Sequence, residues 1–123
     1  MRYLKTYKLF ESVGKDLPDI LIDINDESYW RAECWPDSQR QKWVVVIQTV
    51  DEDEEYELEG QTPPKSVIET IERVIDFMNF EGFSNYQITF ETDEDDQYEE
   101  ITLDEVPGLD VWSNNFIRIE FWK

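Results

Sequence analysis

The sequence contains no histidine, and this absence excludes several kinds of active site at once. Its 123 residues also include only one cysteine and four glycines. Without histidine, catalytic triads and the common zinc sites lose their usual members. With so few glycines, the chain has no glycine-rich loop that could hold a phosphate. We therefore expect a protein that is not an enzyme and that carries no cofactor and no metal.

The single cysteine, Cys34, excludes an internal disulfide and indicates a reducing cytosol. It alternates with Trp30 and Ala32 on the apolar side of a predicted strand, so we expect it to be buried and structural. Long apolar runs are also absent. No stretch approaches the roughly 20 residues of a membrane span, and the start "MRYLKTYKLFES" lacks the apolar core of a secretory signal. A cytoplasmic location is therefore expected.

Basic residues are scarce. Thirty acids face eleven bases, which gives a net charge of −19. The chain is nevertheless 40% hydrophobic and 15% aromatic, which is too apolar for a disordered acidic tail. We expect one folded domain over residues 1–123 that repels nucleic acid and anionic membranes. Its expected partner is a basic protein, while its oligomeric state is left open.

The acids are concentrated in two runs that each follow a predicted strand. Residues 51–59 place seven carboxylates in nine positions, and residues 91–100 read "ETDEDDQYEE". From Val74 to Ile117 there is no Lys or Arg over 44 residues. The candidate partner-binding residues are Asp51, Glu52, Asp53, Glu54, Glu55, Tyr56, Glu57, Glu59, Asp93, Glu94, Asp95, Asp96, Tyr98, Glu99 and Glu100.

Three interpretations of these runs compete. They are solvated loops that keep the protein soluble, calcium loops, or a mimic of a polyanion. The calcium interpretation fails because Tyr56 and Tyr98 occupy the position where an EF-hand needs glycine. Mimicry has a physical basis, since a strand advances about 3.3 Å per residue and one DNA strand carries a phosphate every 3.4 Å or so.

The apolar pattern predicts two helices. "TPPKSVIETIERVIDFMNFEG" predicts a helix over 63–80, with Thr62 as N-cap, prolines in the first turn and Gly82 at the C-terminal cap. "DLPDILIDINDE" predicts a helix over 16–27 capped by Asp16, with a strand as the alternative.

Strands are predicted over 29–35, 42–50, 85–92, 97–103 and 115–123. Residues 1–12 are interpreted as a mobile basic N-terminal segment, with an added edge strand over 3–10 as the alternative. The order helix, strand, strand occurs twice. The predicted fold is therefore α+β: a two-layer sandwich of a four- to six-stranded antiparallel sheet with both helices on one face and an α-β-β pseudo-repeat.

The segments "YLKTYKLFES", "DESYW" and "FEGF" resemble small acidic proteins of T-even-like tailed phages. This resemblance implies a host-takeover or anti-defence role. Leu9-Phe10-Glu11 is similar to the Leu-x-Glu site after which some phage head proteins lose a capsid-targeting segment. The resemblance therefore also admits a head-associated structural protein.

The leading hypothesis is a non-enzymatic acidic protein that binds and inhibits a basic, nucleic-acid-handling host or defence protein. It would act in the host cytosol, with nucleic-acid mimicry as one mode of inhibition. Acids would give long-range attraction and nearby aromatics the close contact. The alternative hypothesis is a bacterial immunity protein that binds a nuclease toxin.

Overall fold

The computed structural model describes residues 2–50, 60–92, 98–112 and 115–123, and for residues 2–12 it describes the backbone only. Within these residues the chain forms α1 (Arg2–Asn25), α2 (Lys65–Phe80) and the short 3-10 helix η1 (Leu103–Gly108). The strands are β1 (Trp30–Asp37), β2 (Lys42–Thr49), β3 (Asn85–Glu91), β4 (Tyr98–Ile101) and β5 (Phe116–Trp122).

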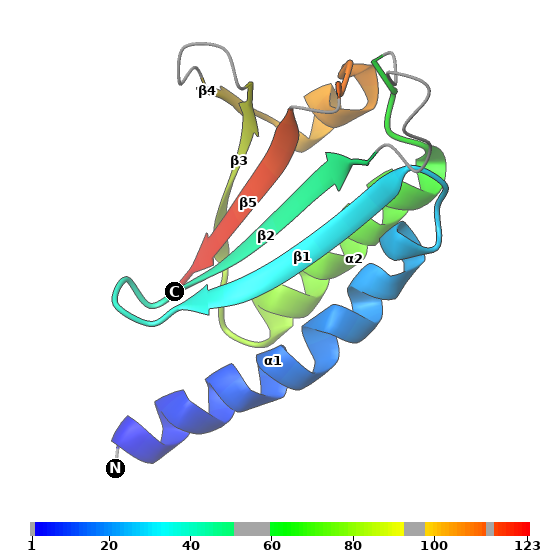
Figure 1. The fold of residues 1–123 in the computed structure, drawn as a ribbon. Coiled ribbons are helices and arrows are strands. Elements are labelled where there is room, and N and C mark those ends of the chain that lie inside the picture. The colour runs from blue at the N-terminus through cyan, green and yellow to red at the C-terminus, as the bar shows by residue number, and fades with distance from the viewer. Residues whose placement is uncertain (1, 51–59, 93–97, 113–114) are drawn as a thin grey trace.

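The five strands form one antiparallel sheet in the order β1-β2-β5-β3-β4. Both α1 and α2 lie on one face of this sheet (Figure 1). The predicted two-layer α+β sandwich is therefore confirmed. Its α-β-β repeat is also present in the topology. The units α1-β1-β2 and α2-β3-β5 place β2 and β5 side by side in the centre, with β4 and η1 inserted before β5.

The core fills the space between the helices and the sheet. Each fully buried aliphatic or aromatic side chain stabilises the fold by about 1.5–3 kcal/mol. The helices contribute residues at helical spacing, and the strands contribute every second residue. The largest fully buried side chains are Phe83, Phe121, Leu17, Leu21, Ile24, Ile47, Ile71, Met78, Ile88, Ile117, Ile119 and Val13.

Helix α1 begins far before the predicted start. Asp16 was expected to cap a helix over 16–27, but it lies inside α1, which begins at Arg2. The edge strand expected over 3–10 is also wrong, because this segment is helical. The buried Val13 precedes Leu17 by one turn, so the apolar stripe continues past Asp16 toward the N-terminus. Packing along this stripe outweighs the hydrogen bond that Pro18 removes.

The prediction for the start of α2 is wrong, and the prediction for its end is confirmed. Thr62 is not the N-cap; that position is Pro64, without a side-chain cap, and the helix starts at Lys65. The reason is that Pro63 is itself followed by a proline and so avoids the α region, which prevents the helix from starting directly after Thr62. The predicted glycine cap is confirmed. Gly82 has φ 97°, and the next residue, Phe83, donates its N–H to the Met78 carbonyl at 2.8 Å.

The predicted strands are confirmed with small shifts of their ends; β1, for example, continues to Asp37, two residues past the predicted end. Among the described helices, none is long and apolar enough to cross a membrane. Cys34 is half-buried rather than fully buried, because β1 is an edge strand with a partner on one side only.

Candidate functional site

The register of the sheet brings together the two strand ends from which the acidic runs depart. Phe116, the first residue of β5, pairs with Gln48 near the end of β2 and with Glu91 at the end of β3. The run at 51–59 follows β2, and the run at 91–100 begins at the end of β3. Since one strand separates β2 from β3, the two departure points are about 10 Å apart. Both acidic runs therefore leave from the same end of the sheet.

Most of the predicted partner-binding residues lie outside the described residues. This applies to every candidate in 51–59 and to Asp93, Glu94, Asp95 and Asp96. The structure describes the other three, Tyr98, Glu99 and Glu100, in the edge strand β4. All three are exposed, and the Tyr98 side chain is 70% exposed. Tyr98 pairs with Glu91, so it lies at the same end of the sheet.

Further acids and one tryptophan gather at this end. Figure 1 shows η1, drawn in orange, beside the start of β5. Asp104 and Glu105 are exposed on η1, Asp110 is exposed just after it, and Trp112 is 47% exposed. We define the acidic end by the described residues Tyr98, Glu99, Glu100, Asp104, Glu105, Asp110 and Trp112.

Sequence reasoning did not place Asp104, Glu105, Asp110 and Trp112 in the site. The available signal was the stretch without a base from Val74 to Ile117, which contains all of them. These four residues lie near the strand ends because of the way the segment between β4 and β5 folds. No local sequence pattern predicts that position.

Local contacts hold this segment in place. Gln61 and Val111 exchange two backbone hydrogen bonds of 2.9 Å. A Cβ atom at Gly60 would lie 2.9 Å from Trp112 Nε1 and 3.0 Å from an Asp110 carboxylate oxygen. The absence of a side chain at Gly60 therefore lets Trp112 and Asp110 lie against the backbone that leaves the first acidic run.

Glu105 has a structural role besides its charge. Thr102 donates its backbone N–H to a Glu105 carboxylate oxygen at 3.2 Å, and its hydroxyl lies 3.1 Å from the same oxygen. This capping box starts η1. Changes to Glu105 would therefore disturb η1, whereas Glu99, Glu100 and Asp104 can be neutralised without removing a described hydrogen bond.

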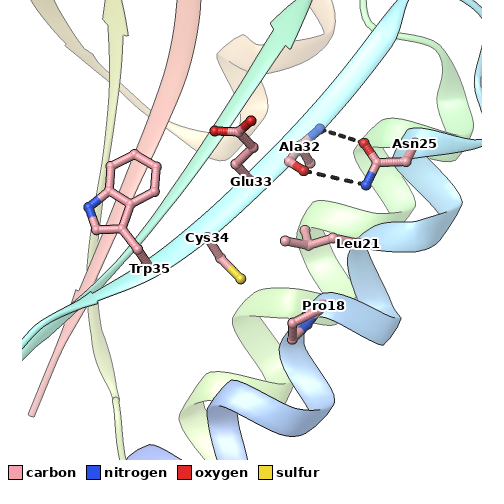
Figure 2. Close-up of a pocket in the computed structure, with 7 residues that line it drawn as sticks. All are labelled: Pro18, Leu21, Asn25, Ala32, Glu33, Cys34 and Trp35. Atoms are coloured by element: carbon pink, nitrogen blue, oxygen red, sulfur yellow. Dashed lines mark hydrogen bonds between the residues drawn. The ribbon is translucent and has the colours of Figure 1, made fainter.

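A separate hollow of about 340 Å³ lies between α1 and the edge strand β1 (Figure 2). Burial raises the pKa of the Cys34 thiol above its ordinary value, so the reactive thiolate is disfavoured at neutral pH. The chain has no imidazole that could activate this thiol. The hollow is lined by Pro18, Leu21, Asn25, Ala32, Glu33, Cys34 and Trp35.

A second hollow, between α1 and α2, contains both signs of charge. Arg73 pairs there with Asp23, and Ser66 donates a hydrogen bond to Glu27. Within the described ranges, no three His, Cys, Asp or Glu side chains are placed to hold a metal ion. The acidic end is thus the candidate site with the most concentrated charge.

The fold and the site together define a two-layer α+β protein with a carboxylate-rich end that also exposes aromatic side chains. No protein-family model matches the chain, and searches of curated proteins and of solved structures find no match either.

Proposed function

We propose that this protein binds and inhibits a basic, nucleic-acid-handling host or defence protein through its acidic end, in the cytosol. The observation that carries the proposal is the shared departure point of the two acidic runs beside Phe116. Carboxylates on one end of a small domain make the local electrostatic potential more negative, which speeds the approach of a basic partner.

Aromatic side chains supply the close contact that charge alone does not. Tyr98 and Trp112 are 70% and 47% exposed in the acidic end. Tyrosine and tryptophan are the residues that most often dominate binding energy at interfaces.

Mimicry of a nucleic acid is the mode of inhibition that we propose. The carboxylate spacing of an extended run matches the phosphate spacing of a nucleic-acid strand. The target would therefore offer a groove that normally holds nucleic acid, and DNA or RNA would compete with this protein for it.

The test compares two variants that change the net charge equally. The site variant carries Glu99→Gln, Glu100→Gln, Asp104→Asn and Asp110→Asn, all exposed in the acidic end. The control variant carries Asp16→Asn, Asp19→Asn, Glu72→Gln and Asp76→Asn, all exposed on the helices. Association rates with the captured target are then measured by surface plasmon resonance at several salt concentrations.

We expect the site variant to associate about tenfold or more slowly and to show a flatter salt dependence. The control variant should stay close to the wild type. Equal slowing by both variants would mean that net charge alone drives the encounter, and the acidic end would lose its assigned role.

A further inference from the structure

The face of the sheet opposite the helices is more apolar than a solvated face requires. Residues of β2 alternate between the two faces, and Val45 and Ile47 point to the core while Val44 and Val46 point away from it. The five consecutive apolar residues from Trp43 to Ile47 are typical of a strand covered on both faces. Figure 1 shows both described α-helices on one side only. On the other side Val44 is already buried by its neighbours, whereas Val46 remains partly exposed.

We call this side the outer face, and β5 runs along its middle. Its outward residues are, in order, Phe116, Arg118, Glu120 and Trp122, two aromatic residues enclosing a base and an acid. When a second copy of this strand runs in the opposite direction above the first, Phe116 faces Trp122 and Arg118 faces Glu120. The outward row of β5 is therefore complementary to itself.

The neighbouring strands show the same property. Outward residues of β2 place Val46 opposite Val44 and Gln48 opposite Lys42 when the strand is reversed. On β1 the same reversal places Arg31 opposite Asp37. In β1, β2 and β5, this arrangement places no like charges directly opposite each other.

We propose that the outer face binds a second copy of this chain, with the two sheets face to face about a two-fold axis that crosses the strands. Such a contact is the isologous type that closes as a dimer. Sheets packed in this way lie about 10 Å apart with their strands within roughly 30° of each other.

The overall charge selects this orientation. Each copy carries a net charge of −19, so two copies repel, and the repulsion is weakest when the two acidic ends lie far apart. An axis across the strands points the two acidic ends in opposite directions. An axis along the strands would place them side by side. The proposed dimer thus keeps both acidic ends apart and open to partners.

The side chains of the outer face are already ordered within one copy. Arg118 Nη2 lies 3.2 Å from a Glu120 carboxylate oxygen, and Lys42 Nζ lies 3.6 Å from the other. Lys42 Nζ also lies 5.3 Å from the centre of the Trp122 ring. This order reduces the side-chain entropy that binding would cost. Glu120 sits between two cations and remains 21% exposed, ready to accept the partner's Arg118.

The size of the face predicts a weak dimer. Four strands spaced about 4.8 Å apart and seven residues long cover roughly 19 by 24 Å. That is roughly 450 Å² on each copy and roughly 900 Å² in total, which is below the roughly 1,200 Å² of stable interfaces and typical of weak ones. We therefore expect a monomer–dimer equilibrium that depends visibly on concentration.

The experiment is sedimentation equilibrium of the full chain under reducing conditions, so that Cys34 cannot cross-link copies. The variants are Arg118→Glu and Glu120→Arg, measured separately and then mixed. Each single variant places like charges opposite each other across the interface. In the mixture, positions 118 and 120 of the two copies again carry opposite charges where they face each other, while the pair within each copy stays broken.

The expected result is a wild-type dimer, a dissociation constant raised about tenfold or more in each single variant, and recovery to within a few-fold in the mixture. The matched control is the Asp23–Arg73 pair, which joins the helices at exposed positions. Asp23→Arg and Arg73→Glu, alone or mixed, should leave dimerisation unchanged.

A wild type that stays monomeric up to about 1 mM would overturn the proposal. So would well-folded single variants whose mixture remains monomeric. If a variant fails to fold, NMR of the wild type alone tests whether the dimer forms. The methyl signals of Val46 should shift with protein concentration, while those of Ile22, 49% exposed on α1, should not. No concentration-dependent shift at Val46 would contradict the dimer.

The proposed dimer contact lies on β1, β2, β5 and β3, whereas the residues changed in the site variant lie on β4, on η1 and just after η1. Either proposal can therefore fail alone. Monomeric variants of the outer face should still bind a basic target. The site variant of the acidic end should still dimerise.

Discussion

At the scale of single residues, Asn25 closes the free edge of the sheet. Its side-chain amide donates to the Ala32 carbonyl at 3.4 Å, and its side-chain oxygen accepts the Ala32 N–H at 2.8 Å (Figure 2). Further along the same strand, Pro36 has no N–H to offer. An unprotected edge invites pairing with other chains. One asparagine and one proline therefore protect β1 against aggregation.

Asn25→Ala should remove both hydrogen bonds and expose the edge of β1. We expect the free energy of unfolding to fall by about 1–2 kcal/mol, measured by urea denaturation. Asn25→Asp keeps an acceptor for the Ala32 N–H and should cost about half as much. An Asn25→Ala variant as stable as the wild type would show that these two hydrogen bonds contribute nothing.

Cys34 should react slowly with thiol reagents in the folded protein. Burial raises the pKa of its thiol, so the unfolded state releases this proton first as the pH rises. The stability from this group is therefore complete below the unfolded pKa and is lost as the pH rises toward the folded pKa. Labelling rates across pH 7–10 or so, native and in urea, check this. A native thiol that titrates below the unfolded one would contradict it.

At the scale of elements, the sequence predicted whether a segment is a helix or a strand better than it predicted where that helix or strand begins and ends. The strands were found because β-branched and alternating residues mark them locally, as in 42–50. The start of α1 was missed because Asp16 looks like a cap, although Val13, one turn before Leu17, continues the apolar stripe. Thr62 was misjudged because the effect of a proline on the residue before it was not weighed.

The C-terminal cap of α2 offers a controlled test of backbone conformation. A Cβ at Gly82 would meet no atom within 4 Å, so only its φ of 97° opposes a side chain. Gly82→Ala should therefore lower the free energy of unfolding by about 1 kcal/mol.

Gly108 is the matched control for this change. A Cβ there also meets nothing within 4 Å, and its φ is not in the left-handed region. Gly108→Ala should be neutral or slightly stabilising. Equal effects of the two substitutions in thermal unfolding would mean that the left-handed backbone at Gly82 carries no cost.

At the scale of the whole molecule, the fold class followed from the sequence but the strand order did not. Strand order depends on contacts between distant segments, such as Phe116 pairing with both Gln48 and Glu91. That pairing also brings the end of β2 and the end of β3, which lead into the two acidic runs, to one end of the sheet. The candidate acids could thus be named from the sequence, while the shared end of the strands that precede them and the position of Trp112 needed the structure.

The net charge of −19 should make the isolated protein less stable at low salt. Self-repulsion is strongest there and is screened over about 10 Å at 0.1 M salt. We expect the melting temperature to rise by several degrees as sodium chloride is added, at a protein concentration too low for dimers. An uncharged osmolyte controls for general solvent effects. A melting temperature that falls with salt would show that attractive ion pairs dominate.

The central claim is that the acidic end recognises one basic, nucleic-acid-handling protein. The most direct measurement is a pull-down from bacterial lysate on the immobilised wild type, the site variant and the control variant, eluted with stepped salt and identified by mass spectrometry. We expect one basic protein that is retained beyond physiological ionic strength on the wild type and the control variant, and that excess DNA displaces. A mixture of basic proteins leaving at low salt, equally from all three surfaces, would contradict it.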